Sequence, residues 1–467
     1  SIQEKAHGPE HPDVANALNS LGILLRAQGS YAEPRLLHER ALAIWEKTLG
    51  AEHPQVSLAL HNLANLLRDQ GFLAEAQPLV ERSLEIREKT LGPEHPKVGE
   101  ALNSLGLILE KQGLHAEAQL LLTRSLVILE KSLGPEHPEV AGTLHNLANC
   151  VKSQGLYAEA RPLYERALAI WEKSLGPEHP TVAIALNNFG ILLQEQGAYA
   201  EARPLYERAL GIREKILGPE HPRIADSLIS LANLLQTLGA YMEALPLYER
   251  ALSIQKNAYG PENPHVAVAL ENLGNFFYNQ KSYAQSQLLH EQALAIKEKA
   301  FGPDHPTVSS SLNNLAIVLQ AQKYFSEAHL FMERALAIRK KTFGPEHPEV
   351  AGTLYNLASM LREQGAHAEV EPMYREAIAV WEKVHGLYHP EMSFFLNSFA
   401  SFLRGQGSYT EAGPLYKQAL ESALNHLSSN IGIMTESERF QYITTQTNPE
   451  PFLLNLIAMR GEGLDKD

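Results

Sequence analysis

The chain has 467 residues, 44% of them hydrophobic and 20% charged, and a formal net charge of −14, a balance that excludes a disordered chain. Because no cluster of lysine or arginine interrupts this acidic background, we do not expect nucleic acid or an anionic membrane to be the main ligand. The single cysteine, Cys150, excludes a disulfide framework, and no apolar run is long enough for a membrane span or a signal peptide, so the expected location is cytoplasmic.

A turn written most often as Gly-Pro-Glu-His-Pro returns every 42 residues along the chain. A fixed period of this length predicts one supersecondary unit that stacks on copies of itself. We number the ten copies in chain order and count positions within a copy from its anchor glycine. The anchors are Gly8, Gly50, Gly92, Gly134, Gly176, Gly218, Gly260, Gly302, Gly344 and Gly386. Any functional surface is therefore expected to be built jointly by several copies.

The fifth copy illustrates the unit. Its apolar and small residues fall at Leu186, Phe189, Gly190 and Leu193, and then at Ala202, Tyr206 and Ala209. Spacings of three and four predict two amphipathic helices, A and B. Gly197 lies between them, where glycine can adopt the left-handed conformation that ends a helix, and Pro180 lies in the expected first turn of helix A. Small residues such as Ala160 are expected to let neighbouring helices approach closely.

The motifs Leu-Asn-Asn-Leu-Ala in helix A and Tyr-Glu-Arg-Ala-Leu-Ala-Ile in helix B resemble the tetratricopeptide repeat (TPR) of the 42-residue kinesin light chain type. The resemblance covers residues 1–428. It implies an all-α fold, a right-handed α-solenoid of about ten helix-turn-helix repeats, and the binding of other proteins as the common property of the family.

Both ends of the chain depart from the repeat. Ser1 to Lys5 match the end of a helix B, so we expect the parent protein to extend upstream. Residues 435–438, Thr-Glu-Ser-Glu, have the pattern of a capping box that opens a different helix, and residues 452–460 predict a second short helix. Residues 429–467 are therefore expected to form a helical cap of the solenoid or a junction to a missing domain.

The resemblance implies that helix A lines the concave face and that its inward positions hold a ligand peptide. Position 12 is asparagine in six copies, at Asn62, Asn146, Asn188, Asn272, Asn314 and Asn356. Position 15 adds Asn65, Asn149, Asn233 and Asn275. Since an amide both donates and accepts, such asparagines can pair with the main chain of an extended peptide. The alternative is that position 12 only bonds neighbouring helices.

Position 18 varies between copies and is where selectivity is expected. Arg26 and Arg68 stand there in the first two copies, and Tyr278 replaces them in the seventh. Guanidinium groups favour an acidic peptide or a C-terminal carboxylate as ligand, although solvated arginines are the alternative. The seventh copy departs most from the pattern, because Lys281 replaces the glycine of its A–B turn, and Lys323 does so in the eighth. These changes predict a bend, an apolar contact patch or a relaxed turn.

Nine loop histidines, from His11 to His389, raise the question of a metal site. Equivalent atoms in stacked copies should lie on the order of 10 Å apart, too far to share one ion, so helix capping is the expected role. Cys150 is expected to be a small core residue. The sequence holds no phosphate-binding loop and no nucleophile with its base, so neither a cofactor nor catalysis is expected of this chain.

Two functions remain open. The first is a non-enzymatic scaffold that binds a peptide or protein partner in the groove. The second rests on a short resemblance of residues 434–440, Met-Thr-Glu-Ser-Glu-Arg-Phe, to the junction that precedes a caspase-like CHAT domain in bacterial TPR proteins. It implies that the chain is the regulatory and recognition half of a protease whose catalytic domain lies outside it.

Overall fold

The computed structural model describes residues 7–27, 32–387 and 389–431, and all of its regular structure is helical. The A helices are α2 (Pro12–Ala27), α4 (Pro54–Asp69), α6 (Pro96–Lys111), α8 (Pro138–Ser153), α10 (Pro180–Glu195), α12 (Ile224–Thr237), α14 (Pro264–Asn279), α16 (Pro306–Ala321), α18 (Pro348–Gln364) and α20 (Pro390–Gly405). The B helices are α3 (Ala32–Leu49), α5 (Leu73–Leu91), α7 (His115–Leu133), α9 (Tyr157–Leu175), α11 (Tyr199–Leu217), α13 (Tyr241–Tyr259), α15 (Tyr283–Phe301), α17 (Phe325–Phe343), α19 (Val370–His385) and α21 (Tyr409–Ile431).

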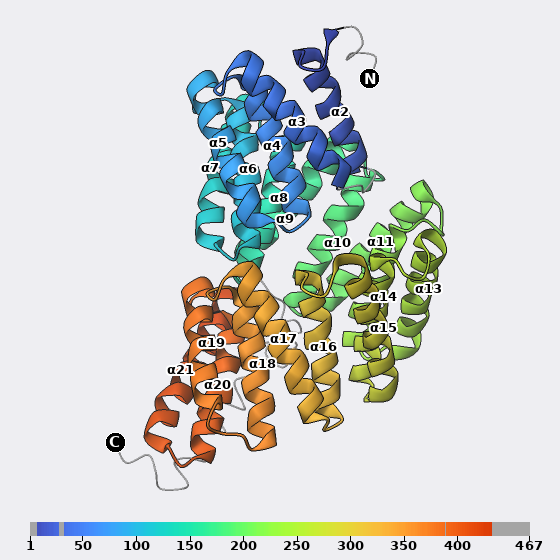
Figure 1. Ribbon diagram of the computed structural model, residues 1–467. Helices are drawn as coiled ribbons and strands as arrows, with labels where there is room; N and C mark the ends of the chain where they lie inside the picture. Colours follow the sequence, from blue (N-terminus) through green and yellow to red (C-terminus); the bar gives the residue numbers. More distant parts are fainter. Residues whose placement is uncertain (1–6, 28–31, 388, 432–467) are drawn as a thin grey trace. The chain divides into compact units, whose positions relative to one another are not determined.

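The chain divides into two compact units, one of residues 1–153 and one of residues 154–467. The boundary divides the fourth copy, with α8 in the first unit and α9 in the second. Within each unit, the A helices of the other copies pack against the B helix of their own copy, and B helices pack against the A helix of the next copy (Figure 1). The predicted α-solenoid architecture of tandem helix pairs is therefore confirmed. The two short helices expected after residue 434 lie outside the described residues.

The repeated turn defines where each A helix begins. The residue at position 3 directly precedes helix A in every copy but the sixth, where α12 begins later and has Arg223 as its N-cap. In all ten copies the side chain at position 3 accepts a hydrogen bond from the backbone N–H two residues later, at 3.0–3.3 Å. The acceptors are Nδ1 of His11, His53, His95, His137, His179, His221, His305, His347 and His389, and Oδ1 of Asn263. The predicted capping role of the loop histidines is therefore confirmed, and an accepting Nδ1 requires a ring without a proton on that nitrogen.

Small residues on helix A face large residues on helix B sixteen positions later. A Cβ added to Gly190 would lie 2.8 Å from the ring of Tyr206, and one added to Gly274 would lie 2.8 Å from His290. Ala160 is fully buried, in line with its expected place at a close helix contact. This complementarity of small and large side chains gives each helix pair its packed core.

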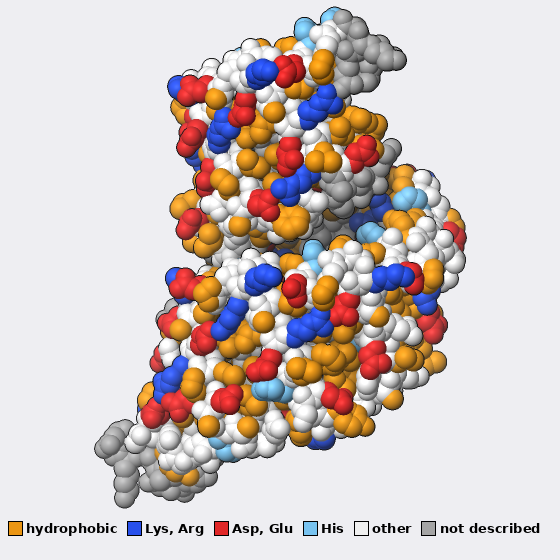
Figure 2. All heavy atoms as spheres, viewed as in Figure 1, with side chains coloured by type: hydrophobic (Ala, Val, Ile, Leu, Met, Phe, Trp, Pro, Cys, Tyr) orange, Lys and Arg blue, Asp and Glu red, His pale blue; other side chains and the backbone are white. Residues whose placement is uncertain are grey.

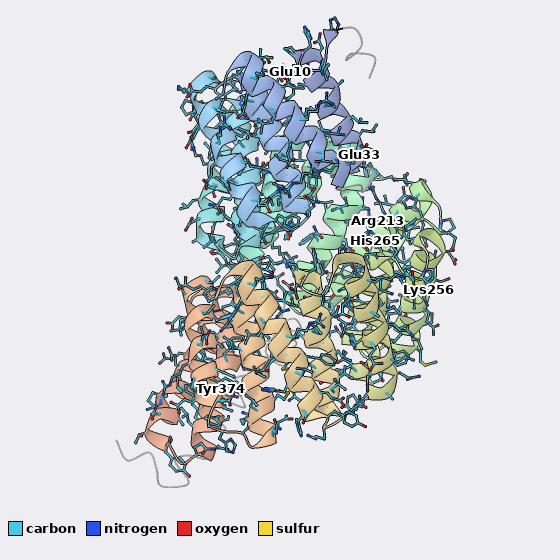
Figure 3. The ribbon with its side chains drawn as sticks, in the orientation of Figure 1. Glu10, Glu33, Arg213, Lys256, His265 and Tyr374 are labelled. Atoms are coloured by element: carbon cyan, nitrogen blue, oxygen red, sulfur yellow. The ribbon has the colours of Figure 1, made fainter. Side chains whose placement is uncertain are left out.

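Buried and half-buried cations of helix B join it to the next A helix. Arg87 donates from Nη1 to the backbone oxygen of Lys97 at 2.6 Å. Arg213, labelled in Figure 3, donates to the hydroxyl of Ser227 at 2.7 Å. Burial lowers the pKa of both guanidinium groups, but each stays within hydrogen-bonding distance of oxygen atoms that offset the loss of water.

The outer surface is rich in ion pairs between positions of fixed spacing. Lysines near the end of helix B contact the acidic residue of the turn that opens their own copy, as Lys47 does with Glu10, which Figure 3 labels. The face drawn in Figure 2 accordingly shows acidic and basic side chains interspersed rather than gathered by sign. Pairs this exposed contribute little each, and salt screens them.

Candidate peptide-binding site

The candidate asparagines lie on the A helices, and most of them are half-buried. In the described part of the chain only Asn275 among them is classed as exposed. Their availability to a partner therefore depends on the hydrogen bonds that each amide already makes. Those bonds follow a simple rule of spacing.

Side chains 43 residues apart face each other across adjacent A helices. Asn62 donates from Nδ2 to Oδ1 of Asn19 at 3.0 Å, and the same oxygen lies 3.0 Å from Nδ1 of His38. The equivalent bond joins Asn146 to Asn103 at 3.0 Å and Asn356 to Asn313 at 3.1 Å. In these three copies position 12 bonds position 11 of the preceding copy, so the alternative interpretation, a structural amide between helices, holds for them.

The bond forms where the preceding copy carries asparagine at position 11. Asn272 follows a copy with Ile229 at that position, and its Nδ2 donates instead to the backbone oxygen of Val268 in its own helix, at 2.9 Å. Asn314 follows a copy with Glu271 there, and no hydrogen bond holds its side chain within the described residues. Asn188 follows His145, and it does have a partner.

Glu271 is occupied by other contacts. Both of its carboxylate oxygens lie 2.8 Å from Nζ of Lys297, and the hydroxyl of Ser311 donates to one of them. The side chains of Lys297 and Glu271 are only 8% and 12% exposed. This buried ion pair replaces the amide bond of the other copies, and it leaves Asn314 without an amide partner.

Position 15 is decided by the residue of helix B that faces it. Asn233 accepts a hydrogen bond from the hydroxyl of Tyr248 at 2.5 Å. Serine at position 15 makes the corresponding contact in two later copies, Ser359 with Tyr374 and Ser401 with Tyr416, each at 3.0 Å. Tyr374, labelled in Figure 3, is fully buried.

Two of the copies with asparagine at position 15 lack the tyrosine. Val80 faces position 15 in the second copy and His290 in the seventh, and within the described residues no hydrogen bond engages the amides of Asn65 and Asn275. Asn149, by contrast, is not free. Of the predicted residues, the free amides are therefore Asn65, Asn275 and Asn314.

The two predicted arginines share one carboxylate. Arg26 donates from Nη2 to Oδ2 of Asp69 at 2.6 Å, and Arg68 donates from Nη2 to Oδ1 of the same residue at 2.9 Å. The side chain of Arg68 is only 14% exposed. Asp69 was not a predicted site residue, although it stands 43 residues after Arg26 and so obeys the spacing of the asparagine pairs. The pair of arginines is half neutralised before any ligand arrives.

Tyr278, the third predicted selectivity residue, is half-buried near the end of α14. Its ring centroid lies 5.6 Å from that of Tyr283, and burial raises the pKa of its hydroxyl. No hydrogen bond engages that hydroxyl within the described part of the chain. Tyr278 therefore lies beside Asn275 as a second free polar group.

The remaining candidate chemistry agrees with a structural role. The thiol of Cys150 is fully buried and lies 3.4 Å from the backbone oxygen of His115. Over the residues that the structure describes, no group of three or more histidine, cysteine or acidic side chains is placed to hold a metal ion. Nor is any described helix both long and apolar enough to cross a membrane.

Two family patterns match the sequence, and both describe the tetratricopeptide repeat. A tetratricopeptide repeat pattern matches residues 14–55, and a second matches overlapping segments from residue 55 to residue 425. No curated protein matches the chain.

Solved structures of related architecture include a putative kinesin light chain from Podosopora anserina with nearly identical TPR-like repeats, which is 28% identical and covers 44% of this chain and 97% of its own, with a TM-score of 0.37. BtubC (BKLC) from P. vanneervenii is 17% identical over 52% of this chain and 93% of its own, with a TM-score of 0.41. A Rap protein solved with Competence and Sporulation Factor is 13% identical, covers 80% of this chain and 99% of its own, and has a TM-score of 0.51. With repeat matches over most of its length, the chain belongs to the tetratricopeptide repeat family.

Proposed function

We propose that the chain is a non-catalytic interaction scaffold that binds an extended peptide along its A helices. Tetratricopeptide repeats fit a protein-interaction scaffold. The observation that carries the finer proposal is the pair of free amides Asn275 and Asn314 on successive A helices of the second unit, at positions whose side chains in other copies bond their neighbours. Asn65 is a separate free amide in the first unit. The Rap protein named above, solved with Competence and Sporulation Factor, has a related fold at low identity and adds support by analogy only.

Hydrogen bonding explains why these three amides suit a peptide main chain. A free primary amide supplies donors and an acceptor, which match the C=O and N–H groups of an extended strand irrespective of its side chains. Asn62, Asn146 and Asn356 already use their donor groups on the preceding copy. They are expected to keep the helices in register and to contribute little to a ligand.

A random peptide display library selected on the immobilised chain tests the proposal. We expect enriched sequences to bind the wild-type chain, and the variant N65A/N275A/N314A to lose at least tenfold in affinity for them. The matched control replaces three exposed residues of B helices, as E159A/E249A/S253A, and should bind as the wild type does. Failure of the library to yield any enriched sequence would overturn the proposal, as would equal binding by the triple variant.

The regulatory role beside a caspase-like CHAT domain stays a second proposal. The residues that suggest it, 434–440, lie outside the described residues. Reading the gene beyond Asp467 tests it directly. A downstream domain of about 250–300 residues with a histidine and cysteine dyad would support it, and a stop codon would overturn it.

A further inference from the structure

Two neighbouring A–B turns carry lysine where the other described turns carry glycine. Lys281 has φ 59° and Lys323 has φ 69°, and they are the non-glycine residues with positive φ in the described chain. The equivalent Gly197 has φ 74°. A side chain in this left-handed region strains the backbone, and glycine would relieve the strain. Strain that persists at two successive turns suggests that the lysine side chains do something that glycine cannot.

Both ammonium groups are accessible. Lys281 is exposed, and no described residue forms an ion pair with it. The side chain of Lys323 is 70% exposed, with its Nζ 3.8 Å from the carboxylate of Glu363 and 5.6 Å from the ring centroid of Phe325. They differ in this from Arg26 and Arg68, which are committed to Asp69.

The lysines follow the two A helices that carry the free amides Asn275 and Asn314. Asn275 and Tyr278 are three residues apart on α14, which places them on one face of the helix, and Lys281 follows in the turn. Asn314 lies on α16 in the same way, and Lys323 stands in the turn that follows this helix. Since adjacent helices of one kind lie on the order of 10 Å apart, the two ammonium groups are expected at about that separation.

The local charge balance also favours an anion. Residues 260–343 carry a net charge of +1, whereas the whole chain carries −14. An acidic ligand therefore meets less repulsion at these two copies than over the chain as a whole. Because the lysines are exposed, this attraction should be strong at low ionic strength and weak at high salt.

We propose that the turns of Lys281 and Lys323 bind the acidic side chains of a peptide whose main chain pairs with Asn275 and Asn314. The inference rests on the proposed function and adds a ligand class to it. In an extended polyproline-like peptide, residues three apart lie on one side at about 9 Å, which matches the expected lysine separation. The preferred ligand is thus an extended segment with two acidic residues three positions apart.

Fluorescence titration of the full chain at low salt tests this with two end-blocked peptides. One has the sequence Ala-Glu-Pro-Ala-Glu-Pro-Ala, and the other has glutamine in place of both glutamates. We expect the acidic peptide to bind about tenfold more tightly than the neutral one, and the variant K281Q/K323Q to lose that preference. The control K215Q/K299Q removes the same amount of charge from exposed lysines of B helices and should keep the preference for the acidic peptide.

The variant K281G/K323G separates binding from folding. It should lose the preference for the acidic peptide as K281Q/K323Q does, while its melting temperature stays level or rises by about 1–3 °C because the turn strain is relieved. A fall in melting temperature would assign the lysines a structural role and overturn the inference. Equal binding of both peptides, or no binding of either, would also overturn it, whereas the proposed function fails if the peptide library yields no ligand or if N65A/N275A/N314A binds the selected peptides as the wild type does.

Discussion

The second and seventh copies have nearly the same helix pair but use it differently. In the second copy Asn62 bonds the preceding helix and Arg68 shares a carboxylate. In the seventh copy Asn272 turns to its own helix, and Asn275 beside it makes no hydrogen bond within the described residues. The comparison teaches that the role of an amide in this array is decided by the residue that faces it from the neighbouring helix.

The largest expected effect comes from breaking the ion pair that sets the seventh copy apart. Replacing Glu271 with alanine leaves the ammonium group of Lys297 buried without its carboxylate, and we expect a loss of about 3–5 kcal/mol in unfolding free energy. Hydrogen exchange of α14 to α16 measures it locally. The double variant E271L/K297M should recover most of the loss, and a single-variant loss below about 1 kcal/mol would contradict a buried charge.

Acid should destabilise the first unit through its buried histidines. Burial lowers the pKa of His38 to about 4, with Arg26 as a lesser cause, and that of His61 to about 3, with Arg87 next in importance. Burial lowers the pKa of His145 to about 4 as well. Since an unfolded histidine has a pKa near 6.5, the folded state binds fewer protons. Stability is then complete above about pH 6.5 and is lost as the pH falls toward 4.

The loss should reach up to about 2 kcal/mol for each such histidine at pH 5. Thermal unfolding at pH 7.5 and pH 5 measures it. His61 offers a matched test, because asparagine occupies its position in other copies, such as Asn103. The variant H61N should fold at pH 7.5 and lose less stability than the wild type at pH 5. If H61N lost as much stability between pH 7.5 and pH 5 as the wild type does, His61 would not be held neutral in the folded state.

Single alanine variants sharpen the contrast between bonded and free amides. N62A removes a hydrogen bond between helices and leaves Asn19 with one donor fewer, so we expect a loss of about 0.5–1.5 kcal/mol. N314A removes a side chain without such a bond and should change stability by less than about 0.5 kcal/mol. Urea unfolding of both variants measures the difference. A loss for N314A as large as for N62A would contradict the assignment of Asn314 as free.

The smallest expected effect concerns the N-caps of the A helices, which the second and seventh copies have in common. Asn263 caps α14 as His179 caps α10, so H179N should leave stability within a few tenths of a kcal/mol. H179A, which has no acceptor, should cost about 1 kcal/mol. Thermal unfolding compares the two, and equal losses would show that the ring of His179 contributes by packing rather than by capping.

The sequence was sufficient to predict the helix pairs, because the information that forms them is local. The cap at His179, the proline after it and the turn glycine all act within a few residues of one another. Repetition at a period of 42 residues then fixed the register of every copy. The buried place of Cys150 followed from the same helical period.

The availability of each candidate amide was harder to predict, because it depends on contacts between copies. Asn62 and Asn314 occupy the same position, and only Asn19 or Glu271 in the preceding copy distinguishes them. The pairing of Arg26 with Asp69 follows the same 43-residue spacing. Comparing each residue with the one 43 positions later would have revealed these partners from the sequence. The free amide of Asn65 also requires the knowledge that Val80, which faces it, has no hydroxyl to donate.

The offset of one residue between facing positions has a consequence for how such an array can change in length. Removal of one whole copy would leave every cap and turn intact but would create a single new junction between A helices. Loss of the seventh copy, for example, would set Asn314 behind Ile229 in place of Glu271. Gain or loss of a repeat by unequal recombination could thus alter binding at one seam while the rest of the array keeps its partners.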